Sequence, residues 1–128
     1  MATAVVCRGA RCTIEYAVRR NGTVPARDFI EQELTVPERA RLFALFQYLA
    51  DSGRNTNPQQ FKKLEGRLWE FKRHQIRVAC FQDGNRWILV SGFRKKEDRW
   101  RKSEIERAHG IMEEHLHREA QQGGGAHG

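Results

Sequence analysis

The chain has 128 residues, the size of one ordinary domain, and hydrophobic residues make up 39% of it, enough for a single core. Lys and Arg number 23 and Asp and Glu 16, which gives a formal net charge of +7. Such a balance favours an anionic partner. No run approaches the ~20 apolar residues of a membrane span, and the short apolar N-terminus does not fit a secretory signal. We therefore expect a cytoplasmic protein with reduced cysteines and no membrane partner.

The positive charge is concentrated in one part of the chain. Residues 60–102 contain 13 basic and 5 acidic side chains, whereas residues 103–128 contain 2 basic and 5 acidic ones. A solvated face usually mixes both signs. The local excess therefore favours a binding site for an anion over a surface that serves only solubility.

One strand and two helices are expected in the first half of the chain. Residues 11–19 alternate apolar and polar side chains, as a half-buried strand does. Residues 25–34 carry apolar side chains at helical spacing behind a proline. Thr35 and Glu38 form a capping-box pattern, which predicts a second helix that stops at Gly53.

In the second half the apolar period changes from helical to alternating, which predicts three strands joined as a meander. They cover residues 68–72, 76–82 and 86–93. A second capping-box pattern at residues 103–106 opens a closing helix. The expected order is strand, helix, helix, three strands, helix. It predicts an α+β domain with a mostly antiparallel four-stranded sheet and helices on one face.

The chain shows no internal repeat, and the expected elements form one domain over residues 11–118. Residues 1–10 are expected to be an N-terminal extension. Residues 119–128 contain a Gly-Gly-Gly run and are expected to be a flexible tail.

Alternation along the meander predicts a basic surface on one face of the sheet. Successive side chains of a strand point to opposite faces, so Trp69 points to one face and Lys72 to the other. In the next strand, Arg77 shares the face of Lys72. Lys95 or Lys96, just after the last strand, reaches the same surface if the meander is antiparallel. Such a surface suits a phosphodiester backbone.

Five pieces of the sequence resemble toxins of the RelE/HigB type from bacterial type II toxin–antitoxin modules, especially the phage-associated HigB-like branch. They are FKKLEG (61–66), LWEFK (68–72), QIRV (75–78), GFRKK (92–96) and SEIERA (103–108). The resemblance covers about residues 11–112. It implies a RelE-like fold and an endoribonuclease that enters the ribosomal A site and cuts mRNA. It also implies a cognate antitoxin, expected to be a helix-turn-helix protein.

The resemblance implies chemistry without a metal or cofactor, in which the 2′-hydroxyl attacks the adjacent phosphorus. It assigns catalytic roles to Lys72, Arg77, Lys95 and Lys96. Lys72 or Lys96 is expected to act as the base, because nearby cations disfavour a protonated lysine. Arg77, whose fork can hold two phosphate oxygens, and Lys95 are expected to stabilise the transition state. Contacts to RNA or the ribosome are expected from Arg67, Arg73, His74, Arg94, Arg99, Arg101 and Lys102.

The chain departs from the family pattern at two places. Several RelE members have a tyrosine in the closing segment, whereas the tyrosines here are Tyr16 and Tyr48. The proline that often precedes the last helix is replaced near Arg101. The general acid is therefore unassigned. His74 is one candidate because its ordinary pKa is near neutrality, and an exposed turn histidine is the simpler interpretation.

Several alternatives stay open. Lys72 can be a plain phosphate contact, and Glu70 is expected to orient Lys72 or Arg77. A non-nuclease toxin of the same fold, such as a ParE-like gyrase inhibitor, and a non-catalytic nucleic-acid-binding module also fit a basic surface. The nuclease hypothesis loses its mechanism if the four cations lie apart, or if Arg77 is buried against a carboxylate.

Overall fold

The computed structural model describes residues 5–95 and 99–127. Three helices and six strands occur there: β1 (Val5–Arg8), β2 (Thr13–Tyr16), α1 (Pro25–Glu33), α2 (Val36–Ser52), β3 (Phe61–Glu65), β4 (Leu68–Arg73), β5 (Ile76–Asp83), β6 (Arg86–Arg94) and α3 (Lys102–His127).

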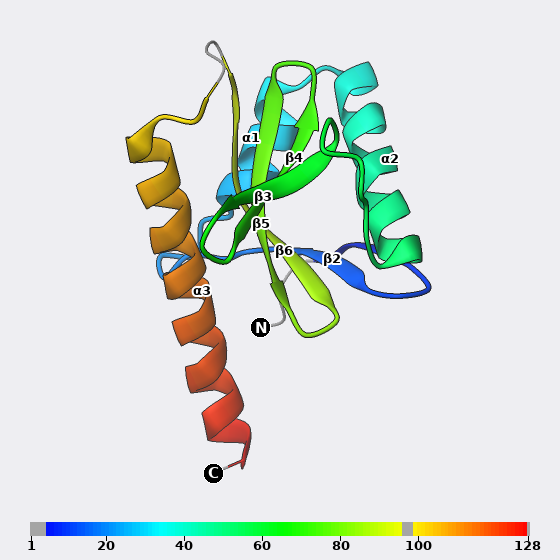
Figure 1. The fold of residues 1–128 in the computed structure, drawn as a ribbon. Helices are drawn as coiled ribbons and strands as arrows, with labels where there is room; N and C mark the ends of the chain where they lie inside the picture. Colours follow the sequence, from blue (N-terminus) through cyan, green and yellow to red (C-terminus); the bar gives the residue numbers. More distant parts are fainter. Residues whose placement is uncertain (1–4, 96–98, 128) are drawn as a thin grey trace.

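All six strands form one sheet in the order β1-β2-β6-β5-β4-β3 (Figure 1). β2 and β6 run parallel, and the other neighbouring pairs are antiparallel. The predicted α+β class and the antiparallel meander are confirmed. The predicted four-stranded sheet is wrong, because β1 and β3 add an edge strand at each side and the sheet is mixed.

The helices lie on both faces of the sheet. α1 and α2 cover one face, and their apolar side chains join a core with Phe71, Val78 and Leu89. α3 covers part of the other face, where its residues pack on Leu68 and Phe81. Figure 1 shows α3 on the side of the sheet opposite α2, with its C-terminal end projecting beyond the sheet. The prediction of helices on one face is therefore wrong.

The first capping box is present at the start of α2. The Glu38 backbone N–H donates to the Thr35 hydroxyl at 3.3 Å, and the Thr35 N–H donates to the Glu38 carboxylate at 2.9 Å. The helix ends at Gly53, whose φ of 80° is left-handed. The second capping prediction is wrong in position, because α3 begins at Lys102 and Ser103 lies inside its first turn.

Polar contacts fix α3 on the second face. The Val18 N–H donates to Nδ1 of the fully buried His115 at 3.1 Å. An ion pair of 2.7 Å joins Arg19 to Glu114, one residue earlier on α3. These contacts tie the helix to the segment that follows β2.

Regular secondary structure continues past both predicted boundaries of the domain, toward the two ends of the chain. β1 lies within the predicted extension of residues 1–10, and α3 continues through His127 into the predicted tail. Within the described ranges, no helix has both the length and the apolar character to cross a membrane.

Candidate nucleic-acid interface

Lys72 and Arg77 lie directly opposite each other on adjacent antiparallel strands, β4 and β5. Directly paired residues in a sheet point to the same face. That face also carries Leu68 and Phe81, which pack against α3. The two cations therefore emerge on the α3 side of the sheet, beyond the region that the helix covers.

Lys95 follows the end of β6 and reaches the same place. Its N–H donates to the Gln75 carbonyl at 2.6 Å, next to the β4–β5 turn, and only 8% of the residue is exposed. Burial lowers the pKa of Lys95, and the charges of Arg77 and Lys72 lower it further, while Glu70 opposes the shift. The sequence-based prediction that Lys72, Arg77 and Lys95 share one surface is therefore in agreement with the geometry.

Lys62 is a fourth cation that the sequence analysis missed. It lies on β3 directly opposite Glu70 of β4, on the face of Lys72. Its charge lowers the pKa of both Lys72 and Lys95. The sequence predicts no strand over residues 61–65, so alternation does not assign the Lys62 side chain to a face. We call Lys62, Lys72, Arg77 and Lys95 the cationic cluster.

Arg77 is held by a carboxylate and by the backbone. Its Nε lies 3.6 Å from Oε1 of Glu70, and the side chain is only 11% exposed. Its Nη1 donates to the carbonyls of His74 and Ile76. Glu70 is 2% exposed and also accepts a hydrogen bond of 3.1 Å from the Trp100 indole. Glu70 was expected to orient either Lys72 or Arg77, and the structure shows that it orients Arg77.

Arg77 is therefore buried against a carboxylate, the arrangement that removes the expected mechanism in which its fork holds two phosphate oxygens. Nη1 is already used by two carbonyls, and Nε faces Glu70. A two-pronged grip on a phosphate is not available in this conformation. Nη2 makes no hydrogen bond with the described residues, so one nitrogen, with its two N–H groups, remains for an anion.

The pKa of Lys72 is lowered, which favours its neutral form. Burial is the largest cause, and the charges of Lys62 and Arg77 add to it, while Glu70 opposes it. A lysine with a lowered pKa has a larger neutral fraction near neutral pH than an ordinary one, and only the neutral amine can accept a proton. Burial also lowers the pKa of Arg77, against the effect of Glu70.

Three predicted RNA-binding arginines lie away from the cluster. Arg67 is in the β3–β4 turn and donates to the Gln82 carbonyl at 3.0 Å. Arg67 is five residues before Lys72, which corresponds to about 16 Å between their backbones in an extended strand. Arg73 and Arg94 pair with Ile76 in the sheet and share its face, which is the face of α1 and α2.

Arg94 is bound to the helical layer. It forms an ion pair of 2.5 Å with Glu38 and donates to the Glu33 carbonyl at 3.0 Å. Arg94 is the largest cause of a Glu38 pKa lowered to about 2. A role of Arg94 in RNA binding stays a prediction, and any such contact would compete with this ion pair.

The remaining predicted residues are exposed or lie outside the described residues. His74 is exposed in the β4–β5 turn with a left-handed φ of 52°. Arg99, Arg101 and Lys102 are exposed where the chain enters α3. Lys96, one of the four predicted catalytic residues, lies outside the described residues.

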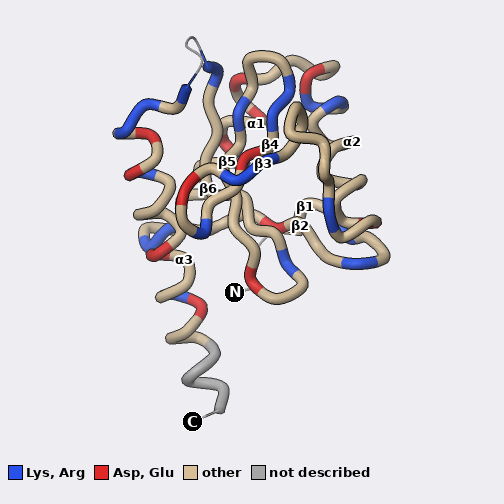
Figure 2. Tube along the Cα trace, viewed as in Figure 1, with Lys and Arg blue, Asp and Glu red and all other residues tan. Residues whose placement is uncertain are grey.

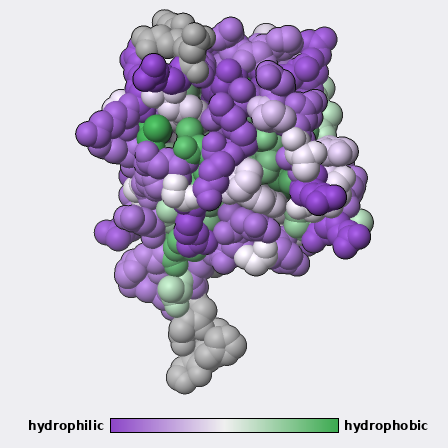
Figure 3. All heavy atoms as spheres, viewed as in Figure 1, coloured by the Kyte–Doolittle hydropathy of each residue, from purple (hydrophilic) through white to green (hydrophobic). Residues whose placement is uncertain are grey.

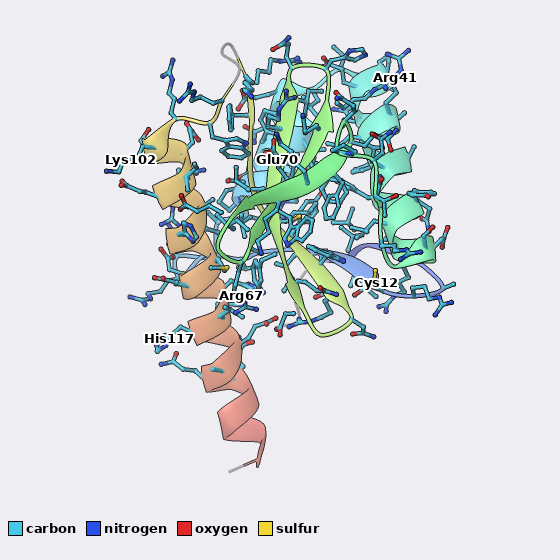
Figure 4. All side chains as sticks on the ribbon, viewed as in Figure 1. Cys12, Arg41, Arg67, Glu70, Lys102 and His117 are labelled. Atoms are coloured by element: carbon cyan, nitrogen blue, oxygen red, sulfur yellow. The ribbon has the colours of Figure 1, made fainter. Side chains whose placement is uncertain are left out.

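The figures show how the charges are arranged. In Figure 2, basic positions follow β3, the β4–β5 hairpin and the segment that leads into α3. Figure 4 places Glu70 on the sheet between α3 and α2, with Lys102 at the outer edge and Arg67 toward the other end of the strands. Hydrophilic atoms cover most of this face in Figure 3, and apolar atoms appear along α3.

The fold and the cluster together define a small α+β protein with four cations on the α3 face of its sheet. The family model described as Phage derived protein Gp49-like (DUF891) matches residues 32–113. The chain therefore belongs to the family of Gp49-like phage-derived proteins, which is associated with toxins of toxin–antitoxin modules. A comparison with curated proteins found no match. The matched segment contains the whole cationic cluster.

Proposed function

We propose that this protein is the toxin of a type II toxin–antitoxin module and a ribosome-dependent mRNA endonuclease of the RelE/HigB type. The observation that carries the proposal is the convergence of Lys62, Lys72, Arg77 and Lys95 on one face of the sheet. Such a cluster suits the charge that develops around a phosphorus during cleavage. Membership of the Gp49-like family supports the toxin part of the proposal.

The proposed reaction uses side chains of the chain itself. Neutral Lys72 takes the proton of the 2′-hydroxyl, and the 2′-oxygen forms a bond to the adjacent phosphorus. The bond from phosphorus to the 5′-oxygen breaks, and that oxygen takes a proton from a general acid. His74 is the candidate for this acid. The products are a 2′,3′-cyclic phosphate and a 5′-hydroxyl. The lowered pKa of Lys72 supports its place as base.

The other members of the cluster stabilise charge in this scheme. Exposed Lys62 faces the phosphate oxygens as a point charge, buried Lys95 adds positive charge beneath them, and Arg77 offers its Nη2. Glu70 is a positioning residue, because in this scheme it holds the guanidinium of Arg77 and makes no contact with the RNA. Arg99, Arg101 and Lys102 are exposed, and the proposal assigns them contacts with ribosomal RNA.

The test is induction of the chain in a bacterial host, with growth and mRNA ends measured by primer extension. We expect growth arrest with new mRNA ends. Lys72→Gln should abolish both, and Arg41→Gln, which removes one exposed charge on α2, should change neither. New ends on naked RNA without ribosomes would contradict ribosome dependence, and arrest without new ends would contradict the nuclease.

A second function is favoured by the Glu70–Arg77 ion pair. A guanidinium held by a carboxylate and two carbonyls can position RNA without taking part in chemistry. The same surface would then be a non-catalytic nucleic-acid-binding module. Salt-dependent RNA binding without growth arrest would support it. DNA damage without new mRNA ends would instead support a ParE-like gyrase inhibitor.

A further inference from the structure

A pocket of about 450 Å³ lies at the β3 edge of the sheet, between the segment after α2 and strand β3, on the face opposite the cationic cluster. Its aromatic lining comes from Phe61, Trp69 and Trp87. Its basic lining comes from Arg54, Lys62 and Lys63. Of these lining residues, Lys62 alone takes part in the proposed cleavage reaction.

The aromatic side chains of the pocket form an ordered group. The rings of Phe61 and Trp69 are stacked, with centroids 5.2 Å apart and planes 13° apart. Trp87 stands at 84° to both rings. Trp69 is partly exposed, whereas Phe61 and Trp87 are buried. A partly exposed indole with buried rings behind it is a stable platform for a planar ligand.

The charge of the pocket selects an anion. Its lining contains three basic side chains and, among the described residues, no acidic one. The ammonium of Lys63 lies 5.6 Å from the centre of the Trp69 ring, so one cation is held next to the platform. A ligand that combines an aromatic plane with negative charge fits both features, and a nucleotide is such a ligand.

Trp87 adds a polar group to the pocket. Its buried indole N–H has no acceptor among the described residues. Buried donors in proteins are usually paired. Nucleobases carry carbonyl and ring-nitrogen acceptors, which an apolar ligand lacks.

We propose that this pocket binds one nucleotide of the single-stranded RNA substrate, with its base on Trp69 and its phosphate between Arg54 and Lys63. The proposal rests on the proposed nuclease function and adds a substrate-binding site to it. Lys62 lines the pocket and also belongs to the cationic cluster. Because the pocket and the cluster lie on opposite faces of the sheet, the proposed RNA strand turns around edge strand β3, where Lys62 borders both.

The test measures binding of a short 2′-O-methyl RNA, which cannot undergo 2′-hydroxyl attack, by fluorescence anisotropy. Trp69→Ala should weaken binding about 5- to 100-fold, the range for loss of one stacked base. Arg54→Gln/Lys63→Gln, at two exposed positions, should weaken it about 10-fold or more. Arg20→Gln/Arg41→Gln removes the same charge elsewhere and should change binding less than about twofold.

The outcomes separate this proposal from the nuclease itself. Wild-type affinity in Arg54→Gln/Lys63→Gln would overturn the pocket proposal, even if Lys72→Gln still abolished cleavage. If Trp69→Ala unfolds the protein, the affinity of Arg54→Gln/Lys63→Gln for the RNA decides whether the pocket proposal holds. Absence of RNA binding by the wild type would overturn the pocket proposal as well. Adenosine or uridine monophosphate that binds as tightly as the RNA would also overturn it, in favour of a free nucleotide.

Discussion

At the scale of single residues, the ion pair of Glu70 and Arg77 has two consequences. The pair holds the Arg77 guanidinium on the surface where a phosphate would bind. Glu70, which is buried, neutralises part of its charge and occupies its Nε side. Removal of one member of a buried pair leaves the other charge without compensation. A variant of Arg77 therefore tests stability as well as function.

We expect Arg77→Ala to lower the free energy of unfolding by about 3 kcal/mol, because Glu70 then stays buried without its cation. Urea denaturation at pH 7 measures this effect. Glu70→Gln/Arg77→Ala is the control, since it removes the buried charge and should recover part of the loss. Equal stability of wild type and Arg77→Ala would show that the pair is solvated. The Arg77 guanidinium would then be available to bind a phosphate.

The two interpretations of Lys72 differ in pH dependence. A base works in its neutral form, so cleavage should rise with pH up to the lowered pKa of Lys72 and fall as pH drops below it. Lys72→Arg keeps the charge but cannot release the proton, so we expect a loss of about 10²- to 10⁴-fold and no such rise. Retention of most activity in Lys72→Arg would make Lys72 a phosphate contact. Cleavage rates between pH 6 and 9 decide this.

The sequence predicted most of the cluster but not its internal arrangement. Strand alternation placed Lys72 and Arg77 on one face, and the register confirms it. Lys62 was missed because β3 has apolar residues on both faces, Phe61 on one and Leu64 on the other, and so lacks a clear period. The contact of Arg77 with Glu70 depends on rotamers and on Trp100, and a strand pattern does not determine these.

At the scale of elements, the position of α3 was the main error in the predicted fold. The run WILV in β6 is apolar on both faces, which is typical of a strand covered on both sides. Ile88 and Val90 indeed pack toward α3, whereas Leu89 packs toward α1 and α2. The sequence therefore contained the signal for a second helical layer. Alternation in β4 and β5 alone suggested an open face, because Lys72 and Arg77 lie beyond the end of α3.

The start of α2 is joined to the end of β6 through Glu38. This carboxylate closes the capping box and pairs with Arg94, and its pKa is lowered to about 2 from an ordinary 4.5. Since the folded-state pKa lies below that of the unfolded chain, the stabilisation is complete above about pH 4.5 and is lost as pH falls toward 2.

We expect the melting temperature of the wild type to fall between pH 5 and pH 2.5, and Glu38→Gln to show a smaller fall from a lower starting value. Circular dichroism melts at several pH values measure both. Glu106→Gln is the control, since that exposed carboxylate lies 4.0 Å from exposed Lys102. Glu114, whose pKa is also about 2, retains its own contribution in each variant. Parallel curves for Glu38→Gln and wild type would contradict the role of this contact.

At the scale of the whole molecule, the charge is distributed unevenly over the fold. The middle of the chain supplies β3 to β6 and the entry to α3, and it holds 13 of the 23 basic residues. The antiparallel meander brings Lys62, Lys72, Arg77 and Lys95 together, whereas Arg73 and Arg94 share the opposite face. Only part of the local excess in sequence therefore becomes a local excess in space, and such an excess raises the rate of encounter with anions in general.

Salt dependence measures how many of these charges contact RNA. If the four cations of the cluster each neutralise one phosphate, the plot of log affinity against log salt should have a slope of about −3 for single-stranded RNA. Lys62→Gln/Lys72→Gln should reduce the slope by about 1.4, whereas Arg20→Gln/Arg41→Gln should leave it unchanged. Anisotropy titrations with 2′-O-methyl RNA from 50 to 300 mM salt give both slopes. An unchanged slope in Lys62→Gln/Lys72→Gln would place the RNA on another surface, because the charges that release counterions would then lie outside the cluster.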